Sequence, residues 1–247
     1  MINKVESIAK NAGSLIVNYF NSKKTDINIK DDGSPVTIAD LESEQYIVSE
    51  LKKNFSYPIV TEENPIEYDI RKDWDQFWLI DPLDGTENFI NNNDGFTVNI
   101  ALIRKGRPIL GVVYAPVLDL TYSAQIDSGA KKNGVSIYNN SKRNKLIAAD
   151  SSYNSSTQTR EFFRVNKIDQ ILNIGSSLKL CSLADGSIDV YPRFNGTKEW
   201  DTAAAHIICK EAGCKILDIE TKKELIYNKK SIKNNFFIAS RNNLFFV

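Results

Sequence analysis

Cysteine and histidine are scarce in this sequence of 247 residues. The three cysteines, Cys181, Cys209 and Cys214, are odd in number and form no CxxC pair. This usage argues against a disulfide framework and predicts reduced thiols in the cytoplasm. The single histidine, His206, supplies with Cys209 and Cys214 three zinc-type ligands, but a fourth is not evident. Because their neighbours read as an apolar helix, we interpret these side chains as core.

Excess charge of either sign is also absent. Lys and Arg together number 31, as do Asp and Glu, so the formal net charge is zero. No global basic field attracts a nucleic-acid polymer, and no polybasic segment favours a membrane surface. Any partner must therefore be recognised by a local site.

Long apolar runs are missing as well. No stretch of 18 apolar residues occurs, so we expect no transmembrane helix. Residues 1–6 carry charge where a signal peptide would need an apolar run, so we expect no signal peptide. These absences predict a cytoplasmic location and leave peripheral association with the inner membrane open.

The alternation of apolar and polar residues predicts an α/β protein with two differently built parts. A chain of this length suits one large domain or two closely packed subdomains. In residues 1–143, helices over 3–21 and from Thr37 to about Phe55 pack on a mostly antiparallel sheet, which makes this part α+β. In residues 144–247, strands and helices alternate as in α/β layering.

The predicted elements and loops can be given by residue range. Strands are expected at 27–29, 57–60, 77–80, 96–103, 109–115, 120–124, 135–137, 146–149, 171–174, 188–191, 215–217 and 236–239. Helices in the second part are expected at about 156–166, 177–184 and 199–212, and surface loops at 65–76, 91–95 and 222–235.

Residues 77–86 are the most informative stretch. Four large apolar residues predict a buried strand that ends abruptly in a turn with Pro82 and Gly85. Asp81 and Asp84 lie three residues apart on that turn, where crowded carboxylates repel each other and are costly to desolvate. A hard cation such as Mg²⁺ would relieve both problems, and Thr86 offers a hydroxyl beside it. The alternative is an ordinary Asp-rich turn after a strand.

Other acidic residues also stand at the ends of predicted elements. Asp40 follows Thr37 by three residues, as in a capping box, and Asp201 falls at the start of a helix, so both could be simple caps. Glu62 and Glu63 follow a short strand and could be metal ligands or a solvated acid pair. The turn Gly175–Lys179 could cradle phosphate or serve as a routine strand–helix connection.

One string carries a specific resemblance. Asp81-Pro82-Leu83-Asp84-Gly85-Thr86 resembles the signature of the Mg²⁺-dependent, Li⁺-sensitive phosphatases related to inositol monophosphatase. Residues 87–90 and 95–103 are similar to the bacterial 3′(2′),5′-bisphosphate nucleotidases, which remove a phosphate from adenosine 3′,5′-bisphosphate (PAP). The resemblance runs from about residue 5 to about residue 220. It implies a layered α-β-α-β-α fold.

The resemblance also implies roles for individual residues. Two or three Mg²⁺ ions would be held by four carboxylates and one carbonyl, and an Asp–Thr pair would activate water. Segments of the form Ser-x-x-Lys and Tyr-x-Arg hold the second phosphate in this branch. The implied metal ligands are Glu62, Asp81, Leu83, Asp84 and Asp201. The implied catalytic pair is Asp40 and Thr86. The implied substrate-binding residues are Ser176, Lys179, Arg193, Gly85 and Thr86, together with four of the metal ligands, Glu62, Leu83, Asp84 and Asp201. The role of Glu63 stays undecided.

The implied activity is hydrolysis of PAP to AMP and phosphate. No Cys or His lies in these motifs, so no covalent phosphoenzyme is expected. Inositol monophosphatase or another sugar-phosphate phosphatase is the main alternative, and a catalytically silent nucleotide-binding regulator is a remote one. Arg193 stands where inositol monophosphatases place an acidic residue, which favours a substrate with a second phosphate. The sequence leaves open the oligomeric state and the preferred substrate among PAP, its sulfated form and 2′-phosphates. It also leaves open whether the pathway is sulfur metabolism or RNA turnover.

Overall fold

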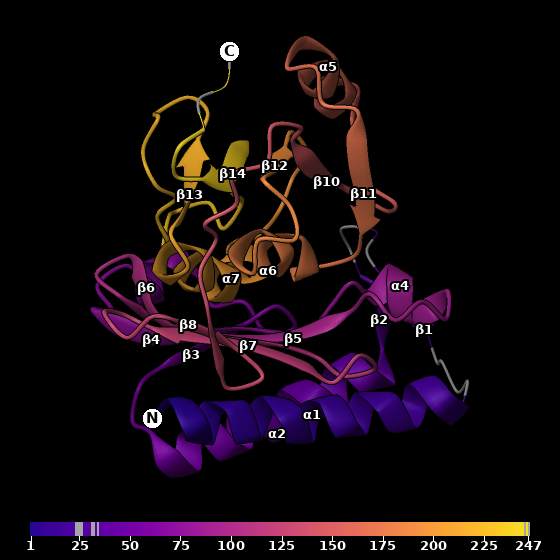
Figure 1. Ribbon diagram of the computed structural model, residues 1–247. Coiled ribbons are helices and arrows are strands. Elements are labelled where there is room, and N and C mark those ends of the chain that lie inside the picture. Colours follow the sequence, from indigo (N-terminus) through magenta and orange to yellow (C-terminus); the bar gives the residue numbers. More distant parts are fainter. Residues whose placement is uncertain (23–26, 31–32, 34, 245, 247) are drawn as a thin grey trace.

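Alternating layers of helix and sheet build the molecule (Figure 1). The computed structural model describes residues 1–22, 27–30, 33, 35–244 and 246. Within these residues, two helices cover a seven-stranded sheet, two further helices separate that sheet from a five-stranded sheet, and another helix lies on the outer side. The predicted α-β-α-β-α layering is therefore confirmed.

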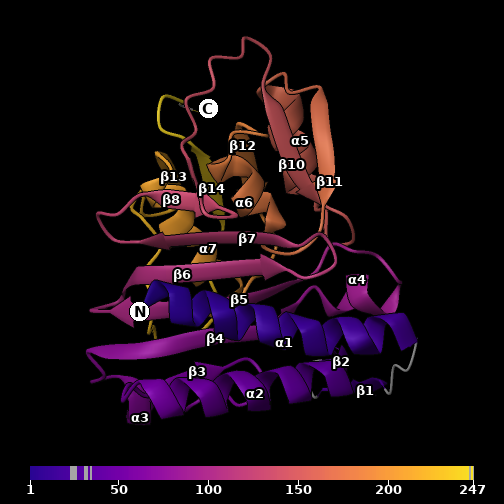
Figure 2. The same ribbon diagram turned by 60° about the horizontal axis from the view of Figure 1, so that its bottom comes forward.

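Helices α1 (Ile2–Ser22) and α2 (Ile38–Asn54) form the first layer, side by side in Figure 2. The apolar residues of α1 recur at helical spacing and are buried against the sheet. A short hairpin, β1 (Ile27–Ile29) and β2 (Pro35–Thr37), leads into α2. Thr37 caps that helix: its hydroxyl accepts the Ala39 N–H, and its own N–H donates to Asp40. The predicted capping box is present.

The seven-stranded sheet has the order β3-β4-β5-β6-β7-β8-β9. Only the β3–β4 pair is parallel. Both faces are covered, so neighbouring residues of β4 enter different cores: Trp78 and Ile80 pack toward α1, and Phe77 and Leu79 pack toward the central helices. The strands are β3 (Ile59–Thr61), β4 (Gln76–Asp84), β5 (Thr97–Arg104), β6 (Arg107–Ala115), β7 (Leu120–Gln125), β8 (Ala130–Lys132) and β9 (Val135–Ile137).

The second half supplies the remaining layers. Helices α6 (Leu178–Ala184) and α7 (Glu199–Glu211) lie between the sheets, and α5 (Thr157–Val165) packs Phe162 and Phe163 on the outer face. The five-stranded sheet has the order β11-β10-β12-β14-β13 and is mixed. Its strands are β10 (Ile147–Ser151), β11 (Gln170–Ile174), β12 (Val190–Arg193), β13 (Cys214–Asp218) and β14 (Phe237–Arg241). The predicted division after residue 143 falls between β9 and β10 and stays a prediction.

Several local features of the structure differ from the expectations or were not predicted. Strand β4 does not end at Ile80 but continues to Asp84. Its register shifts between Asp81 and Asp84, a stretch that contains Pro82, which has no N–H for the ladder. The chain turns only at Gly85 (φ 94°). A short helix, α4 (Thr86–Ile90), then follows where none was predicted. The expected loop 65–76 contains α3 (Tyr68–Arg71), whose buried Arg71 donates to the side chain of Asn228 and to backbone carbonyls.

Glycines allow the two halves to approach closely. A Cβ atom at Gly175 would lie 2.3 Å from the carbonyl oxygen of Gly95, beside the turn that follows β4. A Cβ atom at Gly111 would lie 2.3 Å from the carbonyl oxygen of Ala204 on α7. Since real Cβ atoms keep well beyond that distance, both contacts require glycine, and they set the separation of the layers that form the site.

The single histidine and the cysteines lie in the core. His206 is 2% exposed, and its Nδ1 lies 2.8 Å from the hydroxyl of Tyr227. Burial lowers the pKa of His206 to about 4. All three cysteines are buried and unpaired.

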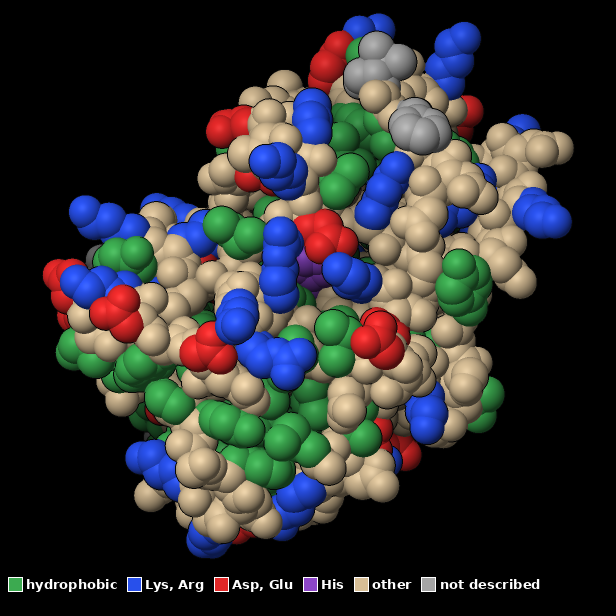
Figure 3. Space-filling view, turned by 90° about the vertical axis from the view of Figure 1, so that its left-hand side faces the viewer, with side chains coloured by type: hydrophobic (Ala, Val, Ile, Leu, Met, Phe, Trp, Pro, Cys, Tyr) green, Lys and Arg blue, Asp and Glu red, His purple; other side chains and the backbone are tan. Residues whose placement is uncertain are grey.

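The surface agrees with the balanced charge of the sequence. On the face seen in Figure 3, Lys and Arg side chains lie among Asp and Glu side chains. In the part of the chain that the structure describes, no helix has the length and apolarity to cross a membrane.

Candidate active site

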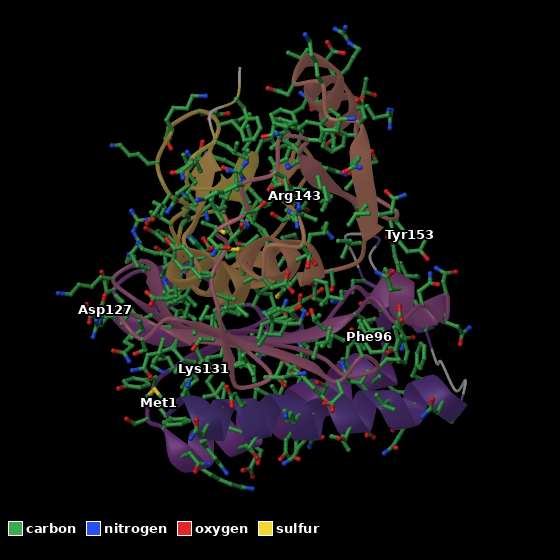
Figure 4. The ribbon with its side chains drawn as sticks, in the orientation of Figure 1. Met1, Phe96, Asp127, Lys131, Arg143 and Tyr153 are labelled. Atoms are coloured by element: carbon green, nitrogen blue, oxygen red, sulfur yellow. The ribbon has the colours of Figure 1, made fainter. Side chains whose placement is uncertain are left out.

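A cavity of roughly 390 Å³ lies where the C-terminal end of β4 meets the second half of the chain. Tyr153, one of its lining residues, is labelled in Figure 4 beside α4. The first half contributes Glu62, Asp81, Leu83, Asp84, Gly85 and Thr86, and the second half contributes Ser176, Lys179, Arg193 and Asp201. Of the predicted site residues, only Asp40 does not line the cavity; it lies behind Thr86.

Asp81 and Asp84 lie on either side of the register shift in β4. Asp81 is 2% exposed, and its carboxylate accepts the N–H of Leu83 at 3.1 Å. One oxygen of Asp84, Oδ2, accepts the backbone N–H of Ser177 at 2.6 Å, its hydroxyl at 2.8 Å and the side-chain amide of Asn99 at 3.2 Å. These bonds join β4 to the start of α6.

The position of Asp201 is compatible with both of its expected roles, helix cap and metal ligand. It is the third residue of α7 and accepts the N–H of Lys198 at 2.9 Å, as a helix cap does. It also lines the cavity, across from the ligand candidates of β4. Capping and ligand binding are compatible because a carboxylate has two oxygens.

Glu62 and Glu63 share one cation. The ammonium of Lys30 lies 2.8 Å from an oxygen of Glu62 and 2.7 Å from an oxygen of Glu63. The side chain of Glu63 is only 5% exposed, so the pair is not simply solvated. The N–H of Glu62 donates to the carbonyl of Ile80, which places Glu62 beside the end of β4.

The electrostatics of the carboxylates match a cation site. Burial and then repulsion from Glu62, Asp84 and Asp201 raise the pKa of Asp81 well above its usual range. Burial, Asp84 and Glu62 raise the pKa of Asp201 to about 8. No three His, Cys, Asp or Glu side chains of the described residues are already gathered in a metal-binding arrangement. The donor chemistry nevertheless fits Mg²⁺: every candidate ligand is an oxygen, and their mutual repulsion is the kind that a hard cation relieves.

Asp40 and Thr86 are brought together. Asp40 uses one oxygen, Oδ2, to accept the N–H and hydroxyl of Thr37 at 2.8 and 2.6 Å. Its other oxygen accepts the hydroxyl of Thr86 at 3.3 Å. Burial raises the pKa of Asp40 to about 6, although the bonds from Thr37 oppose the shift. Helix capping therefore leaves one carboxylate oxygen free to act on Thr86.

The three residues predicted to hold a second phosphate differ in availability. Ser176 lies on the turn before α6 with φ 45°. Lys179 is 6% exposed and donates to the carbonyls of Ile174 and Ser176 at 3.2 and 2.7 Å, so two of its three N–H groups brace that turn. Burial lowers the pKa of Lys179 to about 8. Among the described residues, Arg193 makes only long hydrogen bonds, 3.5 and 3.3 Å, to the carbonyls of Asn154 and Gly196.

Sequence reasoning missed three residues that contact the candidate ligands. Lys30 follows a three-residue strand and carries no motif. Asn99 reads as an ordinary strand residue, although it is 1% exposed and bonded to Asp84. Ser177 had one available signal, its position at the start of the predicted helix 177–184, where serine side chains often form local hydrogen bonds.

Comparison with known proteins decides the family. Residues 1–243 match the inositol monophosphatase family. The chain belongs to the inositol monophosphatase family. This confirms the resemblance seen in the signature at residues 81–86.

Relatives within the inositol monophosphatase family include nucleotidases. The chain is 40% identical over 227 residues to the 3′(2′),5′-bisphosphate nucleotidase CysQ of Escherichia coli K12. The aligned region covers 90% of this chain and 92% of that protein. The crystal structure of CysQ from Bacteroides thetaiotaomicron, a bacterial member of the same family, superposes with a TM-score of 0.87 at 34% identity and 98% coverage of both chains. The structure of an IMPase from Thermotoga maritima superposes with a TM-score of 0.81 at 30% identity, covering 95% of this chain and 89% of that one.

Raising the pH from about 6.5 to about 8 is expected to lower the melting temperature of the metal-free protein. The pKa values of Glu63 and Asp201 are raised by burial to about 7 and about 8, so the folded state binds their protons more tightly than the unfolded state does. The stability that this preference contributes is present at low pH and is lost as the pH rises through those values. Two groups act in the opposite direction: His206 mainly below its ordinary pKa of 6.5, and Lys179, whose pKa burial lowers to about 8, mainly near the upper end of this range.

Mg²⁺ should reverse this loss, because a cation stabilises the deprotonated carboxylates. Thermal unfolding followed by circular dichroism, with and without Mg²⁺ at both pH values, measures the effect. Mg²⁺ should raise the melting temperature more at pH 8 than at pH 6.5. Equal stabilisation at the two pH values would contradict the assignment of the carboxylates as a cation site.

Proposed function

We propose that this chain is a Mg²⁺-dependent 3′(2′),5′-bisphosphate nucleotidase that hydrolyses PAP to AMP and phosphate. The observation that carries the proposal is the 40% identity with the Escherichia coli nucleotidase over nearly the full length of both proteins. The chain is a metal-dependent phosphatase of the inositol monophosphatase family. We also infer a place in sulfur metabolism and a cytoplasmic location.

The proposed metal ligands are the carboxylates of Glu62, Asp81, Asp84 and Asp201 and the carbonyl oxygen of Leu83. Their position on one cavity and their mutual repulsion support this assignment. We propose two or three Mg²⁺ ions per site. When bound, the metal would supply Lewis acidity, lowering the pKa of water and stabilising negative charge on the attacking and leaving oxygens. Li⁺ at millimolar concentration should inhibit the enzyme by occupying part of the same site.

Asp40 and Thr86 are proposed to take a proton from the attacking water. The hydroxyl of Thr86 lies 3.3 Å from both an oxygen of Asp40 and the carbonyl oxygen of Leu83, which share its one proton. When it donates to Asp40, its oxygen lone pairs can accept a proton from water. Asp40 would act through Thr86 as the general base. Gly85 and Thr86 also line the cavity, where their backbone N–H groups can bind oxygens of the phosphate.

Arg193 and Ser176 are proposed to bind the second phosphate of the substrate. Arg193 lines the cavity, its Nε is buried, and that atom has no hydrogen-bond partner among the described residues. A guanidinium with weakly held N–H groups suits a phosphate, which accepts two parallel hydrogen bonds. Lys179 contributes mainly charge, because most of its N–H groups bind the backbone.

Arg193→Ala is expected to weaken the use of PAP by ~1.5–3 kcal/mol, the range for a hydrogen bond to a charged group. Hydrolysis of a small monophosphate should barely change, because that substrate has no second phosphate for Arg193. Values of kcat/KM for both substrates give the comparison. Equal losses on the two substrates would show that Arg193 only supports the fold.

A substrate panel tests the function itself. Phosphate release from PAP, inositol 1-phosphate and fructose 1,6-bisphosphate is measured with Mg²⁺ and with a chelator. PAP should be hydrolysed fastest, and the chelator should abolish release. Faster turnover of inositol 1-phosphate would favour the sugar-phosphate alternative, and PAP binding without release would favour a silent regulator.

A further inference from the structure

A buried hydrogen-bond network surrounds one oxygen of Asp84. Thr97, Asn99 and Ser177 are at most 4% exposed. The hydroxyl of Thr97 donates to the side-chain oxygen of Asn99 at 3.0 Å, which orients the amide so that its NH₂ group points toward Ser177 and Asp84. The two N–H groups of that amide then bind Asp84 Oδ2 at 3.2 Å and the Ser177 hydroxyl oxygen at 2.9 Å. Both N–H groups of the Asn99 amide are therefore used.

Ser177 connects this network to the second half of the site. Its backbone N–H and its hydroxyl both contact Asp84 Oδ2, at 2.6 and 2.8 Å. The same hydroxyl lies 2.7 Å from the backbone carbonyl of Asp201 on α7. A hydroxyl carries one proton, so the carboxylate and the carbonyl share it, and one side chain spans the elements that carry two candidate ligands.

We propose that Asn99 and Ser177 are positioning residues that orient the carboxylate of Asp84 for metal binding and fix its distance from α7. The inference rests on the proposed function, since Asp84 and Asp201 bind metal only in that proposal. Because Oδ2 accepts the Ser177 N–H, the Asn99 amide and a share of the Ser177 hydroxyl proton, the other carboxylate oxygen, Oδ1, is held in one direction. Such outer hydrogen bonds typically change metal affinity or activity ~10–100-fold when they are removed.

Ser177→Ala is the sharpest test. The Ser177 side chain forms no capping bond with α6, so alanine should leave that helix intact while it removes the link to Asp84 and Asp201. Titration calorimetry with Mg²⁺ on the full chain should show a ~10–100-fold weaker Kd. The Mg²⁺ concentration for half-maximal PAP hydrolysis should rise by the same factor, and turnover should largely return at saturating Mg²⁺.

Two further variants complete the experiment. Asn99→Ala should weaken Mg²⁺ binding in the same direction, and the double variant should lose less than the sum of the single losses, because both side chains hold the same oxygen. Ser182→Ala is the matched control: Ser182 lies on the same helix, and its hydroxyl forms no hydrogen bond within the part of the chain that the structure describes. The control should bind Mg²⁺ like the unmodified protein.

The outcomes separate this inference from the proposed function. If the unmodified protein binds Mg²⁺ but does not hydrolyse PAP, the substrate assignment fails, and the calorimetric comparison still tests the positioning role. If folded Ser177→Ala and Asn99→Ala variants bind Mg²⁺ with unchanged Kd, the positioning role is overturned. A lower melting temperature with unchanged Kd would likewise show that the network only supports the fold.

Discussion

Asp84→Asn is expected to lower the rate of PAP hydrolysis at least ~10²-fold, the scale for loss of a charge-stabilising group in an active site. The substitution keeps the shape of the side chain but removes its charge. Oδ2 of Asp84 accepts hydrogen bonds from Ser177 and Asn99, so asparagine must place its carbonyl oxygen there. Its NH₂ group then takes the position of Oδ1 and presents hydrogens to a cation.

The measurement is kcat/KM for PAP over a range of Mg²⁺ concentrations. Asp94→Asn is the matched control, because Asp94 is exposed on the loop after α4 and does not line the cavity. Near-normal turnover of Asp84→Asn at saturating Mg²⁺ would remove Asp84 from the proposed ligands.

Elements with strong local signals were predictable from the sequence. The apolar spacing of α1, the Thr37 capping box and the turn at Asn133 and Gly134 each depend on residues close together in the chain. Asn133 and Gly134 have φ values of 48° and 78°, the left-handed values that a tight Asn-Gly turn requires. In such cases local propensity and tertiary packing favour the same conformation.

Other elements depend on contacts that a local pattern does not contain. Helices α3 and α4 have four and five residues, too few to show helical periodicity. Arg71 is buried because Asn228, 157 residues later, accepts its hydrogen bond. The extension of β4 to Asp84 requires Thr97 and Asn99 of β5 as partners.

The site shows the same contrast between motif and contact. The signature at residues 81–86 indicated the candidate ligands of β4, because these residues are contiguous in the sequence. By contrast, Lys30 lies beside Glu62, which is 32 residues away in the sequence, and Ser177 lies beside Asp84, which is 93 residues away. The burial of Lys179 likewise follows from the packing of α6 between the two sheets. Chain-local motifs thus predict which residues carry the chemistry, and the tertiary fold decides what orients them.

Thr86→Ala is expected to lower PAP turnover by ~10²–10⁴-fold, the range for loss of general-base assistance. The hydroxyl of Thr86 lies 3.3 Å from Asp40 and 3.3 Å from the carbonyl oxygen of Leu83, and it contributes no charge to the metal site. Removing it should therefore leave the Mg²⁺ Kd nearly unchanged while it breaks the path by which a proton from water reaches Asp40. Asp40 itself is a poorer target, because it also caps α2.

Thr86→Ser is the matched control, because serine keeps the hydroxyl and lacks only the methyl group. Serine keeps the proton acceptor, so it should recover most of the turnover that alanine loses. Single-turnover rates at saturating Mg²⁺ and calorimetric Mg²⁺ affinity distinguish the two possible roles of the residue. Weaker Mg²⁺ binding by the alanine variant, with normal turnover once Mg²⁺ is saturating, would make Thr86 a metal ligand and would leave Asp40 without a path to the attacking water.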